Sequence, residues 1–398
     1  MCRVTRQSLP ATSPYRLTIN QRIPACPHNL QAATRSLSSA TAMAANLPPF
    51  LQQTKADLHA KFVDLEWQQR NRLLAGTQTP TDPSAPSSQF ARLTGDAVTA
   101  RNRYLNVEPF AQNRVKLRVK GEGISDYINA SPIQLGKRRY IATQGPKDTG
   151  VNHFYRMLSA ETGARCVVVM LTQTHESGRE KCFQYYPLSA EESPLVIPPD
   201  LETGDGFQGK VELVSVEEDA STRSQIRRLR LRMEDASGAS EEKEIAHLLF
   251  SGWPDFLVPE GEDRTALTRL IQLSARLNAP PSAKTSTGTS NGTTADHDFA
   301  SSEQDNPRII HCSAGVGRSG TFIALDYLLS LLYSGQLDHL QPADRDPVAE
   351  TVDTLRQQRM MMVQGEGQFM FVYEVLREAW IGRFSGRGVG DAVAGAQA

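Results

Sequence analysis

The chain has 398 residues, of which 39% are apolar and 22% charged, so it is long enough for one large domain with a sizeable core. Its 43 basic and 44 acidic side chains leave a formal net charge of −1, which argues against a protein that coats nucleic acid. No run approaches the ~18 consecutive apolar residues of a membrane span, and five irregularly spaced cysteines exclude a disulfide framework and favour a reducing compartment.

Residues 1–45 are predicted to form a basic tail. Residues 1–56 contain no Asp or Glu, and residues 1–42 are rich in Ser, Thr and Ala, a composition that mitochondrial transit peptides share. Four prolines interrupt any amphipathic helix in this region: Pro10, Pro14, Pro24 and Pro27. We therefore expect a disordered tail, or an extension upstream of a start at Met43, and keep mitochondrial targeting as the alternative.

The rest of the chain predicts one α/β (α+β) domain over residues 46–385. A helical pattern begins near Asn46 and continues to Leu73. Short apolar or β-branched runs predict strands at 140–144, 166–171, 210–219, 226–233, 244–253 and 308–313. Further helices are predicted at 321–335, 351–359 and 367–384. Strands that alternate with helices, together with antiparallel-looking strands, indicate a mixed sheet.

Two further segments lack the apolar residues needed to form a core. Residues 279–307 are predicted to be a disordered surface insertion within the domain, because they could not bury enough surface to become ordered. Residues 386–398 are predicted to be a flexible tail.

The segment from His311 to Thr321 carries the chemistry. Cys312 and Arg318 frame five small residues, Ser313, Ala314, Gly315, Val316 and Gly317, between a predicted strand and a predicted helix. Successive backbone N–H groups of such a loop can form an anion nest at the helix N-terminus. Arg318 adds a planar fork that matches a tetrahedral oxyanion. Because a helix N-terminus and nearby cations favour a thiolate, Cys312 is expected to be a nucleophile placed beneath a bound phosphorus.

The expected reaction is displacement to a cysteinyl-phosphate and then its hydrolysis. No cofactor or metal is expected, because Arg318 and the loop amides can stabilise the transferring group. Three other interpretations of these residues are open. Gly315, Gly317 and Gly320 also fit a dinucleotide fingerprint, but that motif expects a further strand ending in an acidic residue about 20 positions on. A buried structural cysteine and a sulfur- or arsenate-handling enzyme are the other two.

The sequence HCSAGVGRSGTF at 311–322 resembles the active-site loop of the classical protein tyrosine phosphatases. Other segments agree in order with motifs of that family: NRYLNV at 102–107, DYINAS at 126–131, YIATQGP at 140–146, Trp253-Pro254-Asp255 and QGEGQF at 364–369. The resemblance covers about residues 90 to 380. It implies a single domain with a twisted, mostly antiparallel mixed sheet flanked by helices, and a non-receptor enzyme that hydrolyses phosphotyrosine on proteins.

The resemblance also implies roles for individual residues. Asp255 lies in the mobile loop that begins at Trp253. It would protonate the leaving tyrosyl oxygen and later activate water. Gln364 would position that water, with Gln368 as its helper. Ser319 would donate a hydrogen bond to the thiolate, or would cap the helix, or both.

Further residues are expected to support or shape the site. Tyr104 would wall a pocket deep enough to admit phosphotyrosine but not phosphoserine. Glu176 would pair with Arg318 and Lys181 would contact the acid loop, unless both are exposed charges in a hairpin turn. His311 is expected to hold the loop backbone and not to act as an acid or base.

Two of the departures from the family pattern bear directly on the site. Asn106 stands where an Asp usually grips the peptide backbone, and Leu257 replaces the usual Gly of the acid loop. The alternatives in function are a pseudophosphatase that binds phosphotyrosine without turnover and a dual-specificity phosphatase. The expected partners are phosphotyrosine proteins, and the family resemblance suggests that kinases are among them. Neither nucleic-acid binding nor a membrane span is expected. We expect a cytoplasmic monomer in signal transduction, with a nuclear location also open.

Overall fold

The computed structural model describes residues 47–78, 87–254, 257–279, 304–340, 342 and 344–384. The predicted tails at 1–45 and 386–398, and Asp255 of the predicted acid loop, lie outside these residues. The described residues belong to one compact unit that begins at Leu47. None of the helices in these parts of the chain combines the length and the apolarity that crossing a membrane requires.

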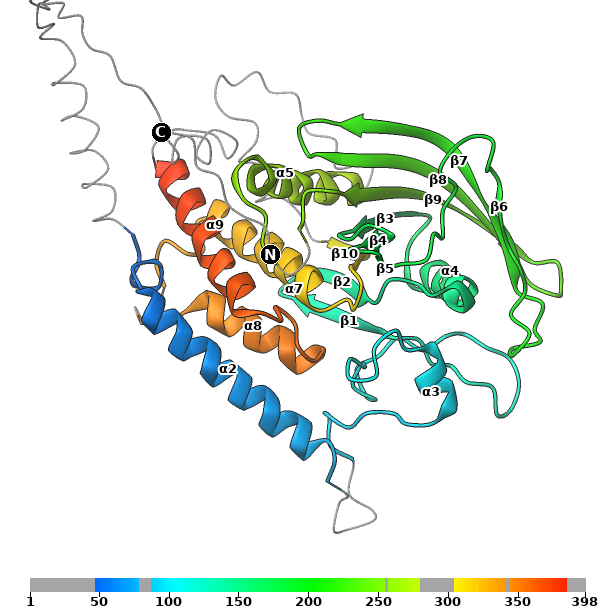
Figure 1. Cartoon of the computed structure of the whole chain (residues 1–398), viewed down its shortest axis with the longest axis horizontal. Coiled ribbons are helices and arrows are strands. Elements are labelled where there is room, and N and C mark those ends of the chain that lie inside the picture. Colours follow the sequence, from blue (N-terminus) through cyan, green and yellow to red (C-terminus); the bar gives the residue numbers. More distant parts are fainter. Residues whose placement is uncertain are drawn as a thin grey trace, which may run out of the picture. The chain divides into compact units, whose positions relative to one another are not determined.

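An eight-stranded mixed sheet lies at the centre of the fold, in the order β1-β2-β10-β3-β9-β8-β7-β6 (Figure 1). Its strands are β1 (Ala130–Leu135), β2 (Arg138–Thr143), β3 (Arg165–Met170), β6 (Leu195–Ile197), β7 (Gln208–Asp219), β8 (Ser224–Glu234), β9 (Ser240–Phe250) and β10 (Gln304–His311). Strands β2, β10, β3 and β9 are mutually parallel, and the four pairs nearer the edges are antiparallel. The predicted mixed, mostly antiparallel sheet is confirmed.

Helices cover both faces of the sheet. The helices are α2 (Lys55–Ala75), α3 (Asp96–Arg101), α4 (Val151–Glu161), α5 (Gly261–Asn278), α7 (Gly317–Tyr333), α8 (Pro347–Gln358) and α9 (Glu366–Phe384), with the short 3-10 turns η1 (Pro49–Leu51) and η2 (Asp148–Gly150). Val167 and Val169 of β3 pack into the core that α5, α7, α8 and α9 share, whereas Val168 and Met170 pack with α4. This two-sided burial explains why the central parallel strands are continuously apolar.

The first helix begins later than its apolar pattern predicts. It starts at Lys55 and not near Asn46, because a capping box fixes its N-terminus. The Thr54 hydroxyl accepts a hydrogen bond from Asp57 N (3.2 Å), and the Asp57 carboxylate accepts one from Thr54 N (2.9 Å). The prediction was wrong here because Phe50 and Leu51 pack into the core from the preceding 3-10 turn.

The predicted insertion at 279–307 is also partly wrong, because residues 304–307 belong to β10. Asn278 Nδ2 donates to Gln304 Oε1 (2.9 Å) and to Asn306 O (2.8 Å), and Asn306 Oδ1 accepts from Gly163 N (2.8 Å). These residues are ordered by amide hydrogen bonds, which a hydrophobic pattern does not reveal. Residues 280–303 lie outside the described residues.

Candidate active site

The loop between β10 and α7 wraps closely around Cys312. Gly315 has a φ of +72°, and a Cβ there would lie 2.1 Å from Thr143 O, so only glycine fits. Gly315 N donates to Cys312 Sγ at 3.3 Å. The cysteine is only 5% exposed, and α7 starts at Gly317 directly after the loop. The sulfur therefore lies beside a backbone donor and next to a helix N-terminus.

A buried arginine holds this loop. Arg359 Nε donates to Gly315 O (2.9 Å), while its Nη2 donates to Ala314 O (3.1 Å) and to Asn129 Oδ1 (2.7 Å). Burial lowers the pKa of the Arg359 guanidinium to about 10, so it remains charged at neutral pH. Arg359 was not among the site residues expected from the sequence. The available signal was an arginine directly before the apolar run at 360–363.

Arg318 is oriented by a carboxylate from the small β4–β5 hairpin, whose strands are His175–Glu176 and Arg179–Glu180. Its Nη1 donates to Glu176 Oε1 (2.6 Å) and to Leu171 O (3.0 Å), and its Nη2 donates to Glu176 Oε2 (2.8 Å). Burial acts to raise the pKa of the Glu176 carboxyl, but the hydrogen bonds and charge of Arg318 outweigh it and hold that pKa below its usual value. The pair is therefore a two-bond fork at neutral pH.

A pocket of about 580 Å³ brings most of the predicted site residues together. Eleven of them line it: Tyr104, Asn106, Glu176, Lys181, Cys312, Ser313, Ala314, Gly317, Arg318, Gln364 and Gln368. Five others are buried and do not line it: Trp253, His311, Gly315, Val316 and Ser319. The pocket thus combines a buried sulfur, a guanidinium fork and an aromatic wall.

The side walls of the pocket are joined by hydrogen bonds between distant segments. Ser313 Oγ donates to Lys181 O (2.9 Å), so the Tyr104 hydroxyl, 2.8 Å away, must donate to Ser313 Oγ. Gln364 and Gln368 cover the start of α7, since a Cβ on Gly317 would lie 3.1 Å from the Gln368 amide and 3.3 Å from Gln364 Oε1. Tyr104 is therefore fixed in place beside the loop.

Behind the loop, His311 makes two hydrogen bonds. Its Nδ1 lies 3.2 Å from Cys312 O, and its Nε2 lies 2.7 Å from the hydroxyl of Tyr185, which is also 2.9 Å from His247 Nε2. Complete burial lowers the pKa of His311 to about 4, so it is neutral at physiological pH. This geometry agrees with the holding role expected of His311.

The predicted hydrogen bond from Ser319 to the sulfur is not formed in this structure. The Ser319 hydroxyl is buried and has no partner among the described residues. It does not cap the helix either, because the N-cap residue of α7 is Val316 and no side chain makes a capping hydrogen bond there. A buried hydroxyl without a partner costs free energy and calls for an explanation. Its donation to a thiolate stays a prediction.

The ends of the predicted acid loop lie on either side of residues 255–256, which are outside the described chain. Trp253 is buried, and its Nε1 donates to Leu257 O at 3.0 Å. Leu257 is exposed. The contact joins the two flanks of the loop, and the role of Asp255 stays a prediction.

Arg103 is a pocket residue that the sequence analysis missed. Its Nε donates to Gly145 O (3.1 Å), its Nη2 to Pro146 O (2.7 Å) and its Nη1 to Glu180 Oε1 (3.0 Å). It lines the pocket beside Tyr104. Its partners lie far along the chain, so its position in NRYLNV was the only signal available.

Comparisons with known proteins give one consistent family. The model of the family described as "Protein-tyrosine phosphatase" matches residues 98–378. The chain is 32% identical over 323 residues to tyrosine-protein phosphatase 2 of Schizosaccharomyces pombe. This alignment covers 81% of this chain but only 39% of that protein. It is 29% identical over 355 residues to tyrosine-protein phosphatase 1 of Saccharomyces cerevisiae, with coverage of 83% and 96%.

Solved structures agree on the fold. The catalytic domain of human protein tyrosine phosphatase non-receptor type 18 superposes with a TM-score of 0.58 at 24% identity, over 83% of this chain and 96% of that one. A second structure of the same phosphatase gives a TM-score of 0.60 at 24% identity, with coverage of 85% and 99%. The family match spans most of the described chain and agrees with the resemblance of its motifs, so the chain belongs to the protein-tyrosine phosphatase family.

Proposed function

We propose that this chain hydrolyses phosphotyrosine on proteins through a cysteinyl-phosphate on Cys312. One observation carries the proposal: Cys312 shares a pocket with Arg318, whose guanidinium is held by two hydrogen bonds to Glu176. A guanidinium oriented in this way binds two oxygens of a phosphoryl group. Because these donors are in place before the substrate binds, they stabilise charge in the transition state without reorganisation.

In the first step, Cys312 Sγ attacks the phosphorus. The S–P bond forms as the bond from phosphorus to the tyrosyl oxygen breaks, and the electron pair of that bond stays on the oxygen. Asp255 gives this oxygen a proton, which makes tyrosine the leaving group. Arg318 and the loop amides bind the remaining phosphoryl oxygens throughout.

In the second step, water hydrolyses the cysteinyl-phosphate. Asp255, now a carboxylate, takes a proton from the water as its oxygen attacks phosphorus, and the S–P bond breaks to restore the thiolate. Gln364 positions the water and Gln368 assists, a role supported by their place over Gly317. The Ser319 hydroxyl, which has no other partner among the described residues, donates to the departing sulfur.

Tyr104 gives the pocket its selectivity. Its ring forms a wall that a phenyl ring can pack against, and its hydroxyl is held by Ser313. A phosphoserine is shorter than a phosphotyrosine, so its phosphate would not reach Cys312. Asn106 lies exposed at the rim, where a neutral amide grips a substrate backbone less strongly than a carboxylate.

We place this activity in cytoplasmic signal transduction, with phosphotyrosine proteins, kinases among them, as substrates. The support is the set of free cysteines in the described chain, Cys166, Cys182 and Cys312, which suits a reducing compartment. We further propose that residues 46–385 act as one catalytic unit.

The test compares a phosphotyrosine peptide with its phosphoserine counterpart, using wild type, Cys312→Ser and Asp255→Ala. We expect turnover of the tyrosine peptide only, its abolition by Cys312→Ser, and a loss of about 10²–10⁴-fold with Asp255→Ala. Asp305→Ala, which removes an exposed carboxylate of β10, is the matched control and should behave as wild type. Tight binding without turnover would mean a binding module, and equal turnover of both peptides would mean a dual-specificity enzyme.

A further inference from the structure

A second pocket, of about 640 Å³, is lined by residues of five segments: 100–101, 147–153, 183–184, 195–196 and 198–202. We call it the side pocket. It lies between the end of α3, the start of α4, and β6 with the segment that follows it. None of its lining residues lines the pocket around Cys312.

The two pockets are neighbours across a shared wall. Gln144 Nε2 donates to Arg101 O, on the side-pocket side, and Gln144 Oε1 accepts from Arg103 N, on the Cys312 side, both at 2.8 Å. Pro146 O accepts from Arg103 Nη2 (2.7 Å) and from Phe183 N (2.8 Å) in the same way. One carbonyl and one buried amide side chain therefore each bond to a residue of both pockets, so the two pockets are neighbours in the fold.

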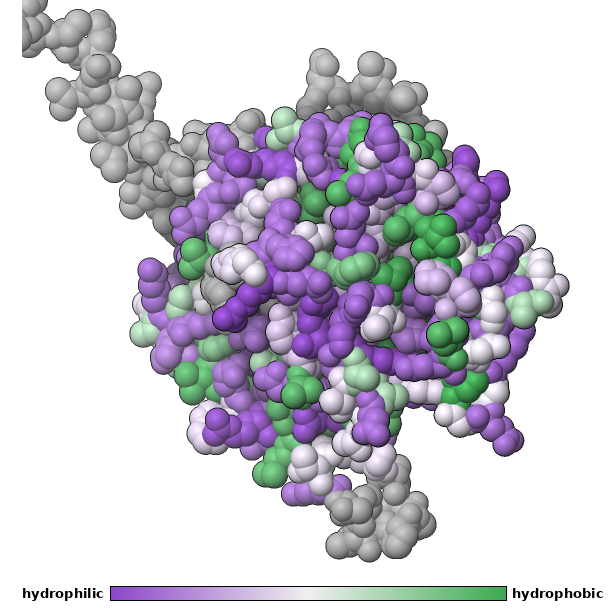
Figure 2. Space-filling view, turned by 45° about the vertical axis from the view of Figure 1, so that its right-hand side comes forward, coloured by the Kyte–Doolittle hydropathy of each residue, from purple (hydrophilic) through white to green (hydrophobic). Residues whose placement is uncertain are grey.

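The rim of the side pocket is apolar and exposed. Phe183 is 38% exposed, Val196 68% and Leu201 93%. Figure 2 shows a mostly hydrophilic surface on which apolar side chains form small separate patches. Three large exposed apolar side chains therefore lie around one hollow.

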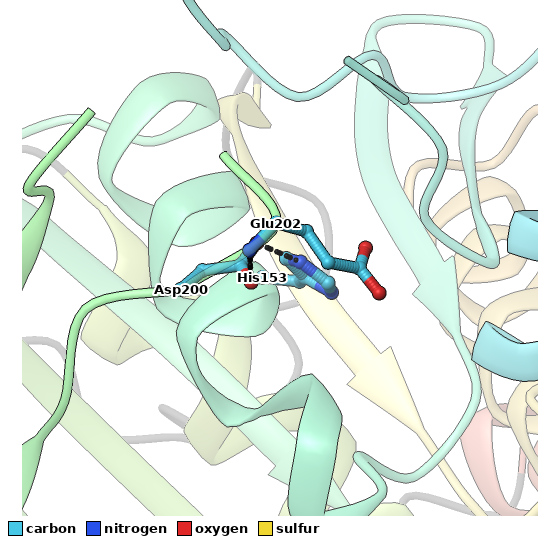
Figure 3. A group of neighbouring side chains, drawn as sticks. All are labelled: His153, Asp200 and Glu202. Atoms are coloured by element: carbon cyan, nitrogen blue, oxygen red, sulfur yellow. Dashed lines mark hydrogen bonds and ion pairs between the residues drawn. The ribbon is translucent and has the colours of Figure 1, made fainter. Parts of the chain in front are cut away.

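Two pairs of polar side chains lie in the side pocket. His153 Nε2 lies 2.7 Å from Asp200 Oδ2, and Arg101 Nη2 donates to Glu202 Oε2 at 2.6 Å. Figure 3 shows the His153 ring between Asp200 and the carboxylate of Glu202. Burial, with the Arg101 charge as the next cause, lowers the pKa of His153, so the ring is neutral at physiological pH.

This pairing decides which ligand suits the pocket. The ligand atoms of His153, Asp200 and Glu202 lie within 4.8 Å of one another, a spacing that could hold a cation. The Arg101 guanidinium already binds Glu202, however, and its charge opposes a second cation there. With these two pairs formed and its rim apolar, the pocket suits an uncharged apolar side chain.

We propose that the side pocket binds an apolar side chain of the same substrate polypeptide that presents its phosphotyrosine to Cys312. The proposal rests on the phosphatase function proposed above and adds a sequence preference to it. The shared wall places the two pockets side by side, and the exposed rim of Phe183, Val196 and Leu201 would be covered only when such a substrate binds. Phosphotyrosine substrates with a suitably spaced apolar residue would therefore bind with a lower KM.

The experiment scans one leucine through each position on both sides of the phosphotyrosine in a serine-rich host peptide. In wild type, we expect one position to raise kcat/KM over the host peptide by about fivefold or more, mainly through KM. Leu201→Ser and Val196→Ser should each remove most of that gain. All rates are expressed relative to p-nitrophenyl phosphate, which is too small to reach the side pocket.

The matched control is Leu74→Ser, which removes a leucine that is 59% exposed on α2, away from both pockets, and should keep the full leucine gain. A leucine scan without any preferred position, or a gain that survives both rim substitutions, would overturn the proposal. So would a dimer in sedimentation that dissociates with Leu201→Ser, because the rim would then bind a second copy. If wild type turns over neither p-nitrophenyl phosphate nor any peptide, the proposed function itself fails.

Discussion

At the scale of single residues, Arg318 depends on Glu176 for its orientation. An arginine side chain has many rotamers, and holding one of them costs conformational entropy. The Glu176 carboxylate accepts from both Nη atoms and itself accepts from the Thr172 hydroxyl at 2.9 Å. The Arg318 guanidinium is therefore fixed before any phosphate binds. Its side chain loses conformational entropy during folding and not during substrate binding.

Glu176→Gln should lower activity more than stability. The amide keeps the size of the side chain but loses its charge and one of its two acceptor oxygens, which leaves Arg318 free to shift. We expect kcat/KM for a phosphotyrosine peptide to fall by about 10–100-fold, the scale of a misplaced binding group. Steady-state kinetics would measure it.

The control for this prediction is Glu66→Gln. Glu66 Oε1 lies 2.8 Å from Arg356 Nη1, and neither residue of this Glu–Arg pair lines the pocket around Cys312. It should change kcat/KM by less than about twofold. Equal losses in both variants would mean that Glu176 has no special part in holding Arg318.

At the scale of elements, the β10–loop–α7 unit is only half specified by its own sequence. Cys312, Arg318 and the glycines between them are contiguous, so their pattern predicted the loop. Arg359, which follows α8, holds the loop carbonyls, and its partner Asn129 precedes β1. Such partners come together only in the tertiary structure, so one sequence could not identify them.

Arg359→Lys tests how much the loop needs this support. Lysine keeps the charge but cannot replace the fork that bonds Ala314, Gly315 and Asn129 together. We expect the free energy of unfolding to fall by about 2–4 kcal/mol, because buried acceptors lose their donors. Urea denaturation would measure the change.

Arg232→Lys is the comparison, because Arg232 is an exposed arginine that pairs with Glu242 at 2.7 Å. A solvent-exposed pair of this kind contributes little to stability, so the substitution should have little effect. If Arg359→Lys is as mild as Arg232→Lys, the loop does not depend on its buried arginine.

Element boundaries show what else the sequence could reveal. The apolar runs of β3, β9 and β10 and of α7 and α9 predicted these elements, because their burial sets their composition. The start of α2 and the start of β10 are set by local polar hydrogen bonds, from Thr54 and Asn306, and these were misjudged. The side pocket could not be predicted, since its five segments meet only in the folded chain.

At the scale of the whole molecule, two-sided burial of the sheet has a consequence for pH. His247 of β9 and His311 of β10 are completely buried between the sheet and its neighbours. Burial lowers the pKa of both, to about 4 for His311, and the charge of Arg227 lowers that of His247 further. Both rings are therefore neutral in the folded protein over a pH range in which exposed histidines become charged.

The fold should lose stability as the pH falls below about 6.5, the ordinary pKa of an unfolded histidine. The unfolded chain binds a proton at His311 there, but the folded chain does not bind one until about pH 4. Between these values the free energy of unfolding should fall by about 1.4 kcal/mol per pH unit for this histidine alone. Urea denaturation between about pH 5 and 6.5 avoids the titration of most carboxyls.

His311→Gln provides the control, because glutamine does not titrate. Its stability should be lower at neutral pH but should fall less steeply between about pH 6.5 and 5 than that of wild type. The same slope in both proteins would mean that His311 is protonated in the folded state.

The hydroxyl of Tyr185, shared by the two buried histidines, also determines where their single protons lie. Cys312 O can only accept, so the neutral His311 ring carries its proton on Nδ1 and must accept at Nε2 from Tyr185. With its one hydrogen used, Tyr185 can only accept from His247, which is therefore the Nε2–H tautomer. This agrees with His247 Nδ1, which has no partner among the described residues. The rings thus hold opposite tautomers, and a one-way line of donors runs from β9 to the carbonyl of Cys312.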